Sequence, residues 1–61
     1  MASALELRER QKIQLTSLLT IKKANQDKHV EELQREIIRL VATMEQEDAA
    51  LVEKIIGVKA L

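Results

Sequence analysis

The chain of 61 residues has no cysteine, no proline and no aromatic residue, and it contains a single glycine. Without cysteine, neither a disulfide nor a thiolate metal site can form. Phe, Tyr and Trp normally supply much of the buried area of a globular core, so a core here must be built from aliphatic side chains alone. Because a chain of this length buries only about 60% of its unfolded surface, we expect an isolated monomer to be marginally stable.

Long apolar segments are also missing. No run approaches the roughly 20 apolar residues that a membrane-spanning helix requires, and no signal-type segment follows the N-terminus. We therefore expect a soluble protein with no membrane span and no visible export signal, and the sequence does not indicate a cellular location.

Residues for chemistry are few. His29 is the only histidine, and a metal site would need three or four converging ligands. Paired carboxylates such as Glu32 and Glu36 lack a pocket that would shift their pKa values, which general acid–base catalysis requires. The sequence therefore predicts no enzyme activity, no cofactor and no metal site.

What the chain has in abundance is typical of helices. Ala, Glu, Lys, Leu and Arg supply 34 of the 61 residues, above the roughly 50% that marks coiled coils and long helices. We expect an all-α protein in which residues 1–61 form a single helical oligomerisation or interaction unit.

The second half has a clear helical stripe of apolar residues, which repeats more nearly every eleven residues than every seven. At 100° per residue the stripe fills an arc of about 120°, the width of a core-facing surface. The helix should end near Ile56, because Gly57 can take the left-handed conformation that closes a helix, and residues 58–61 should form a short tail. The stripe comprises Val30, Leu33, Ile37, Leu40, Val41, Met44, Leu51, Val52 and Ile55.

The first half has a weaker stripe. Ser3 followed by Glu6 fits the spacing of a capping box, which predicts a helix start. The stripe comprises Ala4, Leu7, Leu15, Leu18, Leu19 and Ile21. In one straight helix the centres of the two stripes would differ by about 80° around the axis.

Residues 22–29, KKANQDKH, separate the stripes and contain one apolar residue. A turn near Asn25 to Asp27 would bring the stripes together, since Asn and Asp tolerate turn conformations. We therefore favour a two-helix antiparallel hairpin, with helices at about residues 3–24 and 27–56, that self-associates into a helical bundle. One long helix in an antiparallel coiled coil stays open as the alternative, because the segment has neither Gly nor Pro to break a helix.

The charges favour antiparallel packing. Residues 1–30 carry six bases and three acids, and residues 31–61 carry four bases and seven acids. Asp48 is unusual, because it falls near the centre of the apolar arc. It could pair with Arg8 or Lys12 across the interface, or cap a helical segment starting at Ala49. Alternatively, that end of the apolar face could be exposed to solvent. Burial without a partner is excluded, because an unpaired buried carboxylate is too costly.

These patterns predict a small non-catalytic oligomerisation or adaptor protein that presents an apolar helical face to copies of itself, as a dimer for preference, or to a partner helix. The alternative is a nucleic-acid-binding helical dimer that uses the basic first half. It is disfavoured, because the net charge is zero and no aromatic residue can stack on bases. Arg8 and Asp48 are predicted to set the register. The predicted interface comprises Leu7, Leu15, Leu18, Ile21, Val30, Leu33, Ile37, Leu40, Val41, Met44, Leu51, Val52 and Ile55.

Overall fold

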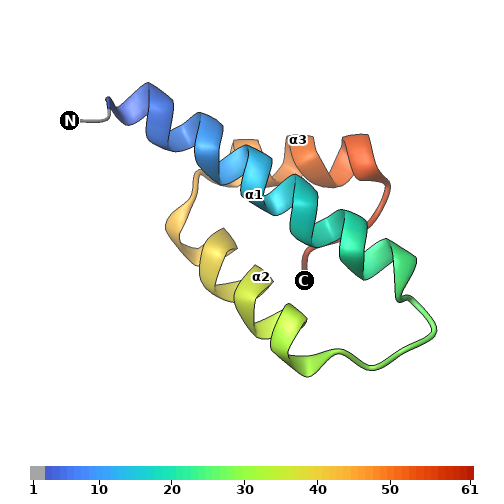
Figure 1. Cartoon of the computed structure of the whole chain (residues 1–61). Coiled ribbons are helices and arrows are strands. Elements are labelled where there is room, and N and C mark those ends of the chain that lie inside the picture. The colour runs from blue at the N-terminus through green and yellow to red at the C-terminus, as the bar shows by residue number, and fades with distance from the viewer. Residues whose placement is uncertain (1–2) are drawn as a thin grey trace.

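The computed structural model describes residues 3–61, which form three α-helices joined by short connections (Figure 1). α1 spans Ala4–Ala24, α2 spans Glu31–Thr43 and α3 spans Gln46–Ile56. No strand occurs in this part of the chain. The all-α class is therefore confirmed. Met1 and Ala2, which belong to the predicted unit, lie outside the described residues.

The two ends of α1 are closed by side chains that the sequence singled out. At the start, Ser3 Oγ accepts a hydrogen bond of 3.1 Å from the Glu6 backbone N–H. At the end, Asn25 donates its backbone N–H to Ile21 O and Lys22 O and its side-chain amide to Ile21 O. These bonds satisfy carbonyls that the helix end leaves free. The chain therefore turns within residues 22–29, and the alternative of one long helix is wrong.

The predicted second helix over residues 27–56 is also wrong in its bounds, because two helices occupy this range. Met44 and Glu45 are extended, with ψ of 166° and 137°, and they redirect the chain between α2 and α3. The Thr43 hydroxyl donates to Leu40 O at 2.9 Å, a local bond that competes with helix continuation. The extended backbone allows Met44 to be buried, with 7% exposure.

α3 runs in nearly the same direction as α1, whereas α2 runs against it (Figure 1). Arg8 near the start of α1 bonds to Asp48 in the first turn of α3. Lys23 near the end of α1 donates to Ile56 O, at the end of α3, at 3.2 Å. The antiparallel hairpin thus describes α1 with α2 but not α1 with α3.

The core lies where α2 and α3 pack against α1. It consists of aliphatic side chains and methionine, as the composition requires, and the molecule is thin, with extents of 39 × 21 × 15 Å. Its buried apolar residues are Leu15, Leu18, Leu19, Leu33, Ile37, Leu40, Met44, Ala49, Val52 and Ala60. None of the three helices is long and apolar enough to cross a membrane.

Gly57 ends α3 as the sequence predicts. Its φ is +80°, and its backbone N–H donates to Glu53 O at 2.7 Å. A side chain is strained in this left-handed region, which glycine adopts freely. The chain therefore reverses after Ile56, and residues 58–61 fold back toward the other helices.

Candidate binding surfaces

Within one chain, a single ion pair joins α1 to α3. Arg8 Nε and Nη2 donate to Asp48 Oδ2 and Oδ1, both at 3.0 Å. The Asp48 side chain is 7% exposed and that of Arg8 is 45% exposed. The guanidinium thus covers the carboxylate with the two parallel bonds that this pair favours. Of the alternatives that the sequence left open for Asp48, the structure shows the contact with Arg8. Asp48 is not the cap of α3, because the cap position is Glu45.

The pair changes the pKa values of both groups. The hydrogen bond from Arg8 lowers the pKa of Asp48, and the positive charges of Arg8 and Lys12 act in the same sense, while desolvation opposes them. The hydrogen bond to Asp48 is also the largest cause that raises the pKa of Arg8. Both groups are therefore held in their charged forms, which suits a structural contact rather than proton transfer.

The tail, residues 58–61, is held by side chains from all three helices. Lys22 Nζ of α1 donates to Lys59 O at 3.0 Å and Ala60 O at 3.4 Å. Gln34 Nε2 of α2 donates to Ala60 O at 2.9 Å. Glu53 Oε1 of α3 accepts from the Ala60 backbone N–H at 3.2 Å, and Ala60 is fully buried. The three side chains bind main-chain groups of the tail.

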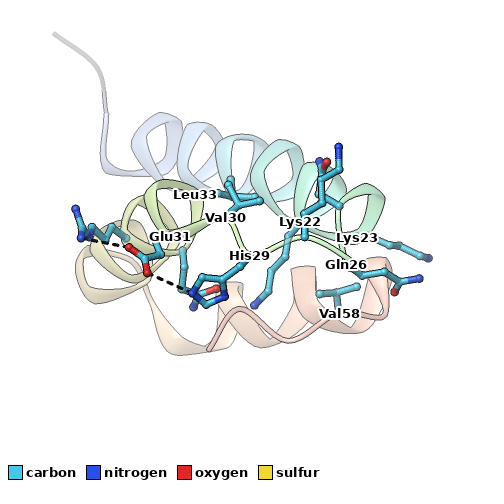
Figure 2. Close-up of a pocket in the computed structure, with 12 residues that line it drawn as sticks. Lys22, Lys23, Gln26, His29, Val30, Glu31, Leu33 and Val58 are labelled. Carbon is cyan, nitrogen blue, oxygen red and sulfur yellow. Dashed lines mark ion pairs between the residues drawn. The ribbon is translucent and has the colours of Figure 1, made fainter.

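Beside the tail lies a pocket of about 570 Å³, which we call the loop pocket. It opens between the end of α1, residues 25–30 and the start of α2. Val30, Leu33 and Val58 provide its apolar surface, and Figure 2 shows Lys22 reaching between Leu33 and Val58. The other lining residues are Lys23, Asn25, Gln26, Lys28, His29, Glu31, Gln34 and Arg35.

The loop pocket is basic. Lys22, Lys23, Lys28 and Arg35 contribute four positive charges and Glu31 one negative charge. Two of the amines are already engaged, since Lys22 and Lys23 donate to backbone carbonyls of the chain itself. Those carbonyls are neutral, so the positive potential of the pocket remains.

His29 is solvated at the mouth of the loop pocket. Its side chain is 88% exposed, and its Nε2 lies 3.3 Å from Glu31 Oε1. The other carboxylate oxygen of Glu31 lies 3.9 Å from Arg35 Nη2 (Figure 2). Within residues 3–61 no three histidine or carboxylate side chains gather where they could hold a metal ion.

A second surface runs along the outside of α1. Leu7, Gln14 and Ile21 follow one another at seven-residue spacing, which keeps them on one side of a helix. We call them the outer line of α1. Leu7 is 53% exposed and Ile21 is 48% exposed. Gln14 lines a shallow hollow of about 480 Å³ together with Glu36, Arg39, Leu40 and Thr43, so the outer line borders α2.

The predicted interface residues divide into two groups. Leu15, Leu18, Leu33, Ile37, Leu40, Met44 and Val52 are buried between the helices of one chain, and Val41 packs against this core. Leu7, Ile21, Val30, Leu51 and Ile55 are exposed. Leu19, which belongs to the stripe of the first half but not to the predicted interface, is fully buried.

Sequence reasoning missed the docked tail and the side chains that hold it. Lys22, Gln34 and Glu53 look like ordinary surface residues in the sequence, because their partners are main-chain groups. The only signal was Gly57 followed by apolar residues, which indicates a chain reversal but not its target.

No protein-family model, curated protein or solved structure matches the chain.

Proposed function

We propose that this protein is a small helical self-association module, in which two copies pack antiparallel through the outer line of α1. The main support for this proposal is that Leu7 and Ile21 are exposed on the same side of α1, with Gln14 midway between them. Two-fold symmetry about Gln14 sets each Leu7 against Ile21 of the second copy. An interface of this kind is self-complementary, as closed dimers require.

The area of the folded chain supports a second copy as the occupant. Its accessible surface is 4844 Å², whereas a compact monomer of 7.0 kDa is expected to expose about 4,000 Å². The excess reflects the thin shape and the large apolar side chains left in solvent. Packing two copies of the folded chain against each other would bury apolar surface that the single chain leaves exposed.

The distribution of charge favours the antiparallel arrangement. The loop pocket is lined by four bases and one acid, whereas Glu45 and Glu47 lie close enough to the Arg8–Asp48 pair to add to the effect of Asp48 in raising the pKa of Arg8. Antiparallel neighbours bring unlike ends together. The contribution of each exposed pair is small, so the charges select orientation more than they add affinity.

The dimer also gives a role to the hollow beside Gln14. Glu36 and Arg39 line it, and neither forms an ion pair within residues 3–61. In the proposed dimer we expect Glu36 of one copy to approach Arg39 of the other across the axis. A polar residue such as Gln14 at the centre of an apolar seam is a known device for fixing register.

A charge exchange tests the proposal. By sedimentation equilibrium, Leu7→Glu and Ile21→Lys should each abolish the dimer, because a charge would face an apolar side chain. The double variant should recover it, since every Glu then faces a Lys of the second copy. Leu5→Glu is the matched control, because Leu5 is also exposed but lies about 160° around the helix from Leu7.

Two results would contradict the proposal. A wild-type chain that stays monomeric at millimolar concentration would reject self-association and favour a partner helix as the occupant of the same surface. Loss of the dimer in both single variants without recovery in the double variant would reject the antiparallel register.

A further inference from the structure

We propose that the loop pocket binds a short extended peptide from a partner protein, in which an apolar residue is flanked by acidic residues. This inference goes beyond self-association, because the pocket opens at the end of the molecule rather than along the outer line of α1. It rests on the way the chain holds its own tail, on the charge of the pocket and on its apolar lining.

The first support is the use that the pocket residues already have. Lys22 and Gln34 both line the pocket, and both donate from their side chains to main-chain carbonyls of the tail. Val58 of that tail forms part of the wall. The wall therefore already binds main-chain groups, and a peptide beside the tail would meet Gln26 and Lys28 as further side-chain donors.

The second support is the charge. With His29 neutral, the lining carries four positive charges and one negative charge, and the single acid, Glu31, lies within 3.3 Å of His29 and 3.9 Å of Arg35. Lys28 has no carboxylate partner among residues 3–61. An acidic segment would find complementary charge here, whereas a basic one would be repelled.

The third support is the size and the apolar surface. About 570 Å³ lies within the range of pockets that enclose drug-sized ligands, which is room for about three or four residues rather than a single ion. Val30 is 38% exposed, although its side chain is apolar. Val30, Leu33 and Val58 together would cover one aliphatic side chain of the peptide.

A titration followed by nuclear magnetic resonance tests this inference. The capped pentapeptide acetyl-AEVEA-amide is added to the 15N-labelled wild-type chain, and amide shifts at Val30, Leu33 and Val58 should saturate. The peptides acetyl-AQVQA-amide and acetyl-AEGEA-amide remove the charges and the apolar residue respectively. Each should bind at least about fivefold more weakly. Inorganic phosphate serves as the probe for simple anion binding.

Matched variants locate the site. Lys28→Glu should weaken binding of the acidic peptide at least about fivefold, and Lys54→Glu, which makes the same charge change at an exposed position outside the pocket, should leave it unchanged. Equal weakening by both variants, equal binding of the charged and neutral peptides, or phosphate producing the same shifts at the same concentration would each overturn the proposal, as would the absence of shifts at these three amides.

Discussion

At the scale of single residues, the ion pair between Arg8 and Asp48 is the contact with the clearest physical consequence. The Asp48 side chain is 7% exposed, and among residues 3–61 it forms its ion pair with Arg8 alone. Truncating the arginine therefore leaves a carboxylate with little water and no counter-charge, which costs more than the net contribution of an intact pair. The two partners should respond unequally to substitution, because Arg8 itself is 45% exposed and can be solvated.

The first prediction is that Arg8→Ala lowers the melting temperature strongly at neutral pH and less in acid. The pKa of Asp48 is lowered from 3.8 in the folded protein, so its stabilising contribution is present above the unfolded value and is lost as the pH falls through the folded value. Below about pH 4 the wild type loses this contribution. In the variant, protonation of Asp48 removes the unpaired negative charge that destabilises it. Thermal melts from pH 7 to pH 2.5 measure how the difference in melting temperature between the wild type and Arg8→Ala becomes smaller.

Arg10→Ala is the control, because Arg10 is exposed and forms no ion pair within residues 3–61. Its melting temperature should stay close to that of the wild type at every pH. Asp48→Leu should be milder than Arg8→Ala, since it removes the buried charge and leaves Arg8 free to reach solvent. If Arg8→Ala and Arg10→Ala behave alike at pH 7, the pair has no structural role.

At the scale of elements, the break between α2 and α3 reverses the direction of the last helix. A continuous helix over residues 27–56 would carry Ile56 toward the start of α1. The observed bond from Lys23 to Ile56 O places it at the other end, where Lys22 also binds the tail. Residues 4 and 23 of α1 are separated by about 28 Å at 1.5 Å per residue, so the two arrangements are easily distinguished.

The second prediction uses this separation. A nitroxide attached to Lys54→Cys should broaden the amide signals of residues 20–24 of α1 and leave those of residues 4–7 sharp. The label should be measured in a sample diluted with unlabelled, isotopically unenriched protein, so that broadening within a chain is separated from broadening between chains. Broadening of residues 4–7 instead would restore the uninterrupted second helix.

The sequence allowed much of this fold to be predicted, and the missing part has a physical explanation. Ser3, Asn25 and Gly57 fix helix ends through local bonds and backbone preference, and local signals of this kind are readable. The break at Met44 has no Gly, Pro or capping hydroxyl after it, and the apolar stripe continues across it. A signal for it was present in the acids Glu45, Glu47 and Asp48, since acids favour the first turn of a helix.

The binding surfaces were readable only in part. Asp48 drew attention because it interrupts an apolar arc. Excluding an unpaired buried charge left its pairing with Arg8 as one of several alternatives and did not select it. The sequence did not indicate which members of the apolar stripes are buried and which are exposed. Two helices, α2 and α3, pack against α1, whereas the prediction had one. The tail contacts depend on main-chain partners, which no side-chain pattern encodes.

At the scale of the whole molecule, the proposed dimer makes stability depend on protein concentration. The third prediction is that a hundredfold dilution lowers the melting temperature of the wild type by roughly 5 °C or more, because dissociation into single chains removes the binding contribution to stability. The melting temperature of Leu7→Glu should be lower and independent of concentration. A wild-type melting temperature that does not change on dilution would show that the single chain is stable by itself.

The separations in sequence between contacting residues predict an order of assembly during folding. α1 and α2 are joined by six residues, whereas Arg8 with Asp48 and Lys22 with Ala60 are 40 and 38 residues apart in the chain. Because closing a longer loop costs more entropy, α1 and α2 should pair early, and α3 with its tail should dock last. The same segment should detach first under stress, so amide hydrogens in residues 46–60 are expected to exchange with solvent sooner than those at the centre of α1.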